Sequence, residues 1–145
     1  MENLLDVGIY IQRKLHFCTD KQVQKITYYA YCWYIVKNNK DSQNITNRLF
    51  EQHPEAWIHG PVFHDLYDEM TYYRKRFLER QEKLSAETKV FLDKIIGIYG
   101  KYTGNQLEDL THNETPWREA RYGLPSDCRS REQLKDSVIF EYYHN

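Results

Sequence analysis

The stretch that decides the fold is KQVQKITYYAYCWYIV, from Lys21 to Val36. It is the most densely apolar and aromatic run of the chain, and at 3.6 residues per turn its apolar side chains occupy several lines of a helix. A helix that packs against the protein on a single side needs an apolar stripe of roughly 100° and no more. We therefore expect a central helix that is buried on most sides. Thr19 and Gln22 fit a capping box at its start, and Asn38 follows its end.

Length and composition are those of a globular chain. The 145 residues fit one domain, which we expect to span residues 1–145 and which can bury about two-thirds of the surface of the unfolded chain. Aromatic residues make up 15% of the chain, with 13 tyrosines and three tryptophans. Tyr and Trp bury a large area at a small cost in conformational entropy and are enriched at interfaces, so the composition favours a binding protein.

Charge and cysteine content exclude several classes of protein. The 20 basic and 21 acidic residues give a net charge of -1, which argues against a protein that wraps duplex nucleic acid. Cys18, Cys32 and Cys128 show no CxxC spacing, which indicates neither a disulfide framework nor a zinc knuckle and favours the cytoplasm. We read no signal peptide and no membrane span, and no cofactor motif occurs.

The rest of the chain predicts a mainly α fold: a single compact helical domain of about six to seven helices with a small β-hairpin before a Gly-Pro turn. The hairpin is expected within residues 45–58, ahead of Gly60 and Pro61. Residues 74–84 fit either a charged helix or an exposed loop. Helical spacing and capping residues predict the other helices at residues 4–15, 64–73, 85–99, 103–111, from 115 and 130–142. Ser85 and the Thr103–Gln106 pair are expected to cap two of them, and Pro116 is expected at the first position of the helix from 115.

Two of these helices carry specific expectations about packing. Residues 85–99 are predicted to bury a stripe of Val90, Phe91, Lys94, Ile95 and Ile98. The last helix is predicted to begin with a capping box of Ser130 and Gln133. Its inner side is expected to carry Leu134, Val138, Ile139 and Tyr142.

Histidines offer the one cluster to test as a metal site. His53, His59 and His64 fall within twelve residues, followed by Asp65 and Asp68. A helical zinc pair has histidines at i and i+4 on one face, whereas His59 and His64 are five apart across the Gly-Pro turn. Surface or capping histidines are therefore the favoured interpretation, and no metal is predicted.

Catalysis has little support in the sequence. There is no GxSxG motif, no glycine-rich phosphate loop and no acid pair with assignable roles, so an enzyme is not predicted. The rival hypothesis is a small metal-dependent hydrolase or nuclease that uses His59, His64, Asp65 and His112. It requires these side chains to converge within hydrogen-bond or metal reach of one another.

A basic run offers a second rival hypothesis, a nucleic-acid-binding protein. Residues 74–83 contain five Lys or Arg residues next to Tyr72 and Tyr73, a combination that single-stranded nucleic-acid binders use. Glu79 and Glu82 lie within the same run. A solvated helix face with charges of both signs is the favoured interpretation, so contact with nucleic acid is not expected.

Three segments taken together resemble a known family: residues 23–30, residues 56–62, and residues 110–112 with Pro116 and Trp117. They look like the Panacea domain, also called the SocA-like antitoxin domain, and the related phage-associated GepA proteins. The resemblance implies a mostly helical antitoxin that neutralises a cognate toxin by direct binding. In the SocA branch it also implies an adaptor that delivers the toxin to the ClpXP protease. The resemblance is compatible with either a monomer or a homo-oligomer.

The resemblance also implies a set of signature residues, with roles in the architecture or in toxin binding. No catalytic, cofactor or metal residue is implied. The signature residues are Lys25, Tyr28, Tyr29, Trp57, Gly60, Pro61, Val62, Thr111, His112, Pro116 and Trp117.

Overall fold

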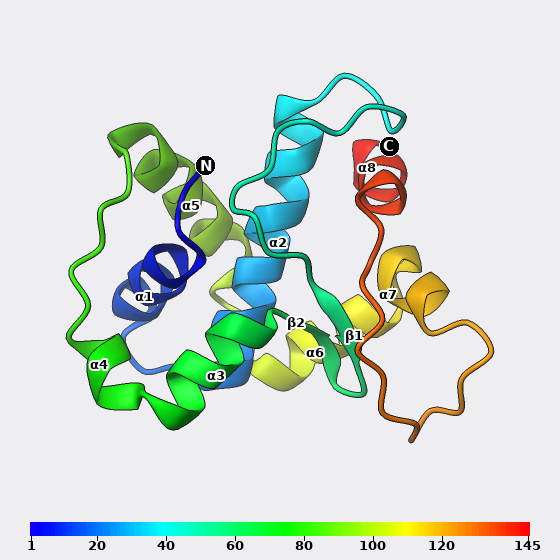
Figure 1. Ribbon diagram of the computed structural model, residues 1–145. Helices are drawn as coiled ribbons and strands as arrows, with labels where there is room; N and C mark the ends of the chain where they lie inside the picture. Colours follow the sequence, from blue (N-terminus) through cyan, green and yellow to red (C-terminus); the bar gives the residue numbers. More distant parts are fainter.

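The computed structural model describes all of residues 1–145 and confirms a mainly helical fold with one small antiparallel hairpin (Figure 1). No helix is both long and apolar enough to cross a membrane. The elements in chain order are α1 (Leu4–Leu15), α2 (Asp20–Asn38), β1 (Glu55–Trp57), β2 (Gly60–Val62), α3 (His64–Tyr72), α4 (Arg74–Leu78), α5 (Ala86–Tyr99), α6 (Gly104–His112), α7 (Thr115–Ala120) and α8 (Asp136–His144).

Helix α2 is the centre of the molecule, as predicted. Every residue from Val23 to Cys32 is buried, and Ile35 extends the buried surface by one more turn. Helices α1, α3 and α5 pack on one side of α2, and β2, α6 and α8 pack on the other (Figure 1). An all-round apolar helix thus joins two groups of elements that make few contacts with each other.

The start of α2 shows how local and distant contacts combine. The Thr19 hydroxyl accepts a hydrogen bond from the Gln22 backbone N–H at 3.1 Å, as expected for a cap. The Gln22 side chain does not return to Thr19, because it donates to the carbonyls of Gly100 and Tyr102 at 3.4 and 3.0 Å. Only the Thr19 half of the predicted capping box is therefore formed. The Gln22 side chain instead connects α2 to the segment between α5 and α6.

The hairpin lies slightly later in the chain than expected. Its strands pair Glu55 with Val62 and Trp57 with Gly60, so the Gly-Pro pair belongs to the second strand. Gly60 has a φ of 105°, in the region that favours glycine, and it directly follows the two-residue loop of Ile58 and His59. Leu49 and Phe50 are buried without forming a strand.

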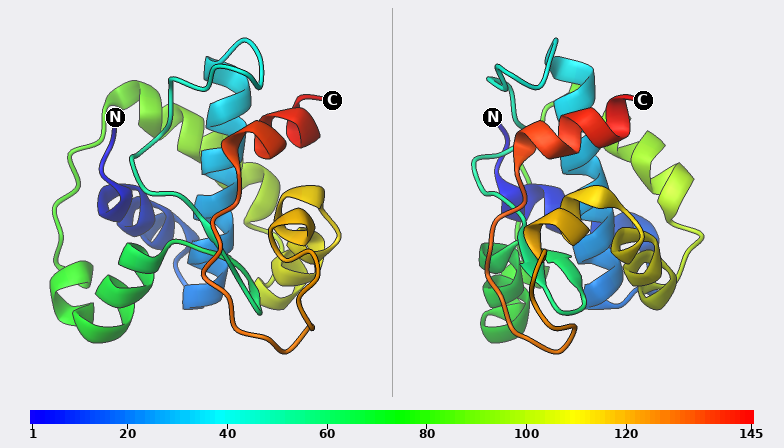
Figure 2. Two further views of the ribbon diagram at one scale, coloured as in Figure 1. Left: turned by 45° about the vertical axis from the view of Figure 1, so that its right-hand side comes forward. Right: turned by 90° about the vertical axis from the view of Figure 1, so that its right-hand side faces the viewer.

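A third extended segment, residues 132–134, pairs with the free edge of β1. The Ala56 N–H donates to Glu132 at 2.7 Å, and the Leu134 N–H donates to Pro54 at 2.9 Å. Figure 2 shows this segment running beside the hairpin before it reaches α8. The expected helix start at Ser130 is therefore wrong, because the backbone of this segment is used by the hairpin.

The last helix consequently begins at Asp136 and turns a different side inward. Ile139 is buried as predicted, but Phe140 and Tyr143 accompany it in place of Val138 and Tyr142. In α5, similarly, the helix and its Ser85 cap are confirmed, but the buried line is Leu92, Ile95 and Tyr99. Val90 and Ile98 are 57% and 55% exposed. Both helices carry apolar residues on more than one side. Which side is buried depends on the elements that pack against the helix.

Candidate functional site

Most of the signature residues lie in the hairpin or beside it, whereas Tyr28 and Tyr29 contact the C-terminal part of the chain. The signature residues come from α2, from both strands, from α6 and from α7, segments that are up to 92 positions apart in the sequence. We use the name hairpin platform for β1 and β2 together with the four side chains that bind the backbone of residues 56–63. These side chains belong to Gln24, Lys25, Trp117 and Arg121.

Two side chains of α2 bind the outer edge of the second strand. Lys25 donates from Nζ to the Pro61 carbonyl at 2.9 Å. Gln24 accepts from the Phe63 N–H at 3.0 Å and donates to the Phe63 carbonyl at 3.1 Å, as a neighbouring strand would. All three bonds are buried. An exposed strand edge offers unpaired backbone groups to other chains, and α2 closes this edge.

Gly60 allows α2 and α6 to approach the hairpin closely. A Cβ atom at this position would lie 2.8 Å from Lys25 Cε and 3.0 Å from Thr111 Oγ1. Thr111 itself is buried and donates to the Glu108 carbonyl at 2.8 Å. The glycine is therefore required both by its positive φ and by its contacts.

The α7 side binds the first strand through an indole and a guanidinium. Trp117 Nε1 donates to the Trp57 carbonyl at 2.9 Å, and Arg121 Nη1 donates to the Ala56 carbonyl at 2.9 Å. Arg121 Nη2 also donates to the carbonyls of residues 125 and 128 at 3.2 and 2.6 Å. The His112 ring stacks on Trp117 with centroids 3.9 Å apart.

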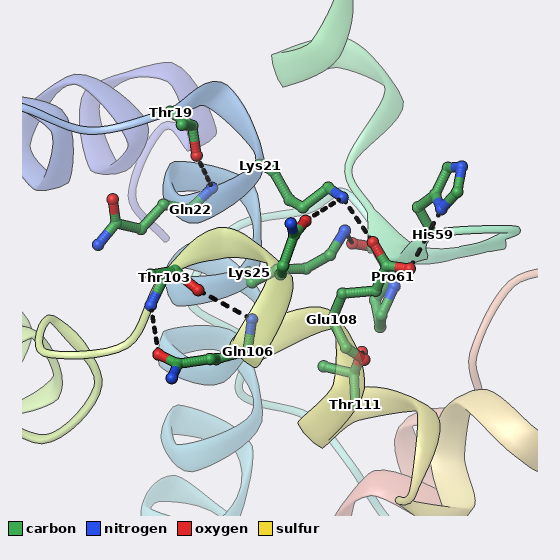
Figure 3. Close-up of polar contacts among 11 residues, drawn as sticks. Thr19, Lys21, Gln22, Lys25, His59, Pro61, Thr103, Gln106, Glu108 and Thr111 are labelled. Atoms are coloured by element: carbon green, nitrogen blue, oxygen red, sulfur yellow. Dashed lines mark hydrogen bonds and ion pairs between the residues drawn. The ribbon is translucent and has the colours of Figure 1, made fainter.

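A small charged cluster borders the platform (Figure 3). Lys21 Nζ lies 2.6 Å from Glu108 Oε1, and His59 Nδ1 lies 3.1 Å from Glu108 Oε2. Burial acts to raise the pKa of Glu108, but the hydrogen bonds from Lys21 and His59 hold that pKa below its usual value. Burial also lowers the pKa of His112, whose buried Nε2 has no hydrogen-bond partner in the protein. The cluster fixes the tip of the hairpin against α6.

Tyr28 and Tyr29 bind the C-terminal part of the chain to α2. Glu114 accepts hydrogen bonds from Tyr29 and Tyr143, both at 2.7 Å, and the Tyr28 and Tyr143 hydroxyls lie 3.3 Å apart. Burial raises the pKa of Glu114, and the two hydroxyl donors only partly offset this. These contacts connect α2, the start of α7 and α8.

A comparison with known protein families gave a match. The family model described as "Antitoxin SocA-like, Panacea domain" matches residues 23–118. The chain belongs to the Panacea family. The comparison with curated proteins and the comparison with solved structures gave no match. All eleven signature residues of this Panacea domain lie inside the matched range, while α1 and α8 lie outside it.

The histidines are held apart by separate partners. His53 Nδ1 lies 3.3 Å from the Tyr31 hydroxyl, and His64 Nε2 lies 3.5 Å from Asp68. Asp65 accepts from Gln52, while His112 stacks on Trp117. No group of three or more His, Cys, Asp or Glu side chains is placed to hold a metal ion. The convergence that the hydrolase hypothesis requires is not found among these residues.

Most basic residues of the run at 74–83 form ion pairs within the Panacea domain. Arg74, Arg76 and Arg80 form ion pairs with Asp20, Glu69 and Asp6 at 3.0, 2.6 and 2.7 Å. Asp6 and Glu69 are 6% exposed, so two of these pairs neutralise buried carboxylates. The run forms α4 and then an extended segment that reaches Ser85. These three arginines connect the run to α1, α2 and α3. Because their charges are paired within the protein, most of the positive charge of the run is not available to bind nucleic acid.

Sequence reasoning missed four polar residues of the site. Gln24 and Lys25 lie in the N-terminal part of α2 beside the polar residues Lys21 and Gln22, so the local sequence does not mark Gln24 as buried. Arg121, Glu108 and Glu114 carry no signal either, because nothing in the neighbouring sequence marks them as buried or hydrogen-bonded. Their partners are found only when the helices pack.

Lys25 should give the domain a measurable pH dependence. Its side chain is fully buried, and burial lowers its pKa from 10.5 to about 7, against the opposing effect of Glu108. Between these two values the unfolded chain holds a proton that the folded protein lacks, so stability rises with pH. From pH 7 to pH 9 we expect the wild type to gain on the order of 2 kcal/mol relative to Lys25→Met.

Chemical denaturation of both proteins at several pH values measures this gain. The comparison cancels groups that both proteins share, such as Cys32, whose burial raises its thiol pKa. Stability curves that run parallel from pH 7 to pH 9 would show that Lys25 is charged in the folded state.

Proposed function

We propose that this Panacea domain is an antitoxin that neutralises a cognate toxin by binding it directly. The observation that carries the proposal is the family match over residues 23–118. A protein that works by binding benefits from a surface that is already ordered, because less conformational entropy is then lost on association. The hairpin platform has this property, since buried and half-buried side chains bind its backbone at Ala56, Trp57, Pro61 and Phe63.

We also propose that the functional unit extends beyond the matched range to residues 1–145. Helix α1 packs against α2, α3 and α5, and α8 packs against α2 and α7. Their side chains Ile9, Ile11, Ile139 and Phe140 belong to the same apolar core as Tyr28 and Tyr29. The three cysteines are free, which suits the reducing cytoplasm where we place the protein.

The test is co-expression with the product of the neighbouring gene. We expect that product alone to arrest growth, this chain to restore growth, and the two proteins to elute together in size-exclusion chromatography. Failure of both the rescue and the complex would contradict the antitoxin assignment. Repeating the rescue in cells that lack ClpXP separates the two modes: masking persists without the protease, whereas delivery to the protease is lost and toxin accumulates.

A further inference from the structure

We propose that the toxin docks in a hollow on the exposed side of the hairpin platform, through a segment that carries an apolar side chain next to a carboxylate. This rests on the proposed antitoxin function and adds where and by what chemistry the toxin is held. The hollow lies between the hairpin, α3 and residues 129–131, and its volume is about 740 Å³. We call it the hairpin hollow.

The walls of the hairpin hollow are suited to an apolar side chain. Trp57, Ile58, Val62 and Tyr67 line it, and Trp57 and Tyr67 are in edge contact with their ring centroids 5.0 Å apart. Trp57 is held further by a 2.8 Å hydrogen bond from its indole to Glu55, and it is partly exposed, as Ile58 is. Ordered, partly exposed aromatic rings are typical of the residues that dominate binding energy at protein interfaces.

The charges around the hairpin hollow select an acidic partner. No Asp or Glu lines the hollow, and four of its lining residues are basic, namely His59, His64, Arg129 and Arg131. The carboxylates that pair with three of them, Glu108, Asp68 and Glu55, are not among the lining residues. Arg129 is exposed, and its side chain makes no hydrogen bond or ion pair within the chain. Its guanidinium can therefore accept a carboxylate in a bidentate fork.

A protein segment fits this chemistry better than a nucleotide does. Arg131 is already engaged by Glu55 at 3.2 Å and by His64 at 2.7 Å, which leaves Arg129 as the one uncommitted cation of the hollow. One arginine beside apolar walls matches one carboxylate beside an aliphatic or aromatic side chain. A triphosphate spreads its charge over several groups and needs several uncommitted donors.

The decisive variant is Arg129→Glu, which reverses the free charge without removing a contact within the chain. With the toxin encoded by the neighbouring gene we expect its Kd to rise at least about tenfold, as for charge reversal at an interface, and growth rescue to weaken. Lys40→Glu is the matched control. Lys40 is exposed, makes no ion pair and follows the C-terminal end of α2, and Figure 1 shows that end of α2 far from the hairpin.

A second variant tests the apolar walls. Tyr67→Ala removes a ring that is 37% exposed and contacts Trp57, and we expect weaker toxin binding with little loss of stability. Tyr72→Ala removes a ring that is 69% exposed at the end of α3 and does not line the hollow, so it should bind the toxin normally. Far-UV circular dichroism and melting curves check that all four variants are folded.

The strongest result would be a charge swap, in which an Asp→Lys or Glu→Lys change in the toxin restores binding to Arg129→Glu. Normal toxin binding by both Arg129→Glu and Tyr67→Ala would overturn the hollow while leaving the antitoxin function intact. A wild-type chain that neither binds nor rescues would instead overturn the function itself. Binding of ATP or GTP that is lost in Arg129→Glu, without toxin binding there, would also overturn the proposal.

Discussion

Replacing Arg121 with methionine is expected to lower the free energy of unfolding by about 2–4 kcal/mol. Arg121 is 6% exposed, and its guanidinium donates to the carbonyls of Ala56, Pro125 and Cys128. Methionine fills a similar volume but donates no hydrogen bond. The Ala56 carbonyl is then left buried without this donor, while water can reach the two loop carbonyls and partly offset the loss.

Two further variants show whether the guanidinium fork is the cause. Arg121→Lys keeps the charge but loses the planar fork that reaches several carbonyls, so its stability should lie between wild type and Arg121→Met. Arg118→Met is the matched control, because Arg118 is exposed on α7 and makes no side-chain hydrogen bond or ion pair. Its effect should stay within about 0.5 kcal/mol. Urea unfolding followed by tryptophan fluorescence measures all three, and equal losses in Arg118→Met and Arg121→Met would contradict the assignment.

Gly60→Ala is expected to lower the free energy of unfolding by about 2–6 kcal/mol, since two effects add. An alanine at a φ of 105° is strained by about 1–3 kcal/mol. Its Cβ would also meet Lys25 Cε at 2.8 Å, and Lys25 cannot move aside freely because it is fully buried and bonded to Pro61. Crowding of a packed interior typically adds about 1–3 kcal/mol.

Two other glycines separate these contributions. Gly123 has a φ of 82° with no atom near its would-be Cβ, so Gly123→Ala should show the backbone strain alone. Gly97 lies within α5 with open space around it, so Gly97→Ala should stabilise the protein by about 0.5–1 kcal/mol. Thermal and urea unfolding of the three variants give the ranking. A loss in Gly60→Ala no larger than that in Gly123→Ala would show that Lys25 and Thr111 yield without cost.

Truncation of Trp57 is expected to cost less stability than truncation of a core tryptophan, because its ring is only partly buried. A loss of about 3–5 kcal/mol on truncation to alanine applies to a fully buried ring. The Trp57 ring is partly exposed in the hairpin hollow, although its backbone carbonyl is bound by Trp117. A smaller loss of stability together with weaker toxin binding is therefore expected from Trp57→Ala.

The sequence by itself determined the features that depend on neighbours a few residues away. The apolar run from Lys21 to Val36 specified the central helix, and Thr19, Ser85 and the Thr103–Gln106 pair marked helix starts that the structure confirms. The helix over residues 64–73 and the proline-initiated helix at Thr115 are confirmed for the same reason. Helical periodicity and capping act within one turn, so a single segment contains the information.

Only the tertiary structure decided which side of α5 is buried, where the last helix begins, and what the basic run and the signature residues contact. The hydrogen bonds from Lys25 to Pro61, from Trp117 to Trp57 and from Arg121 to Ala56 join residues 36, 60 and 65 positions apart. Such pairs form because packing removes these donors and carbonyls from water, and each must then find a partner inside the protein. No local pattern in the chain names that partner.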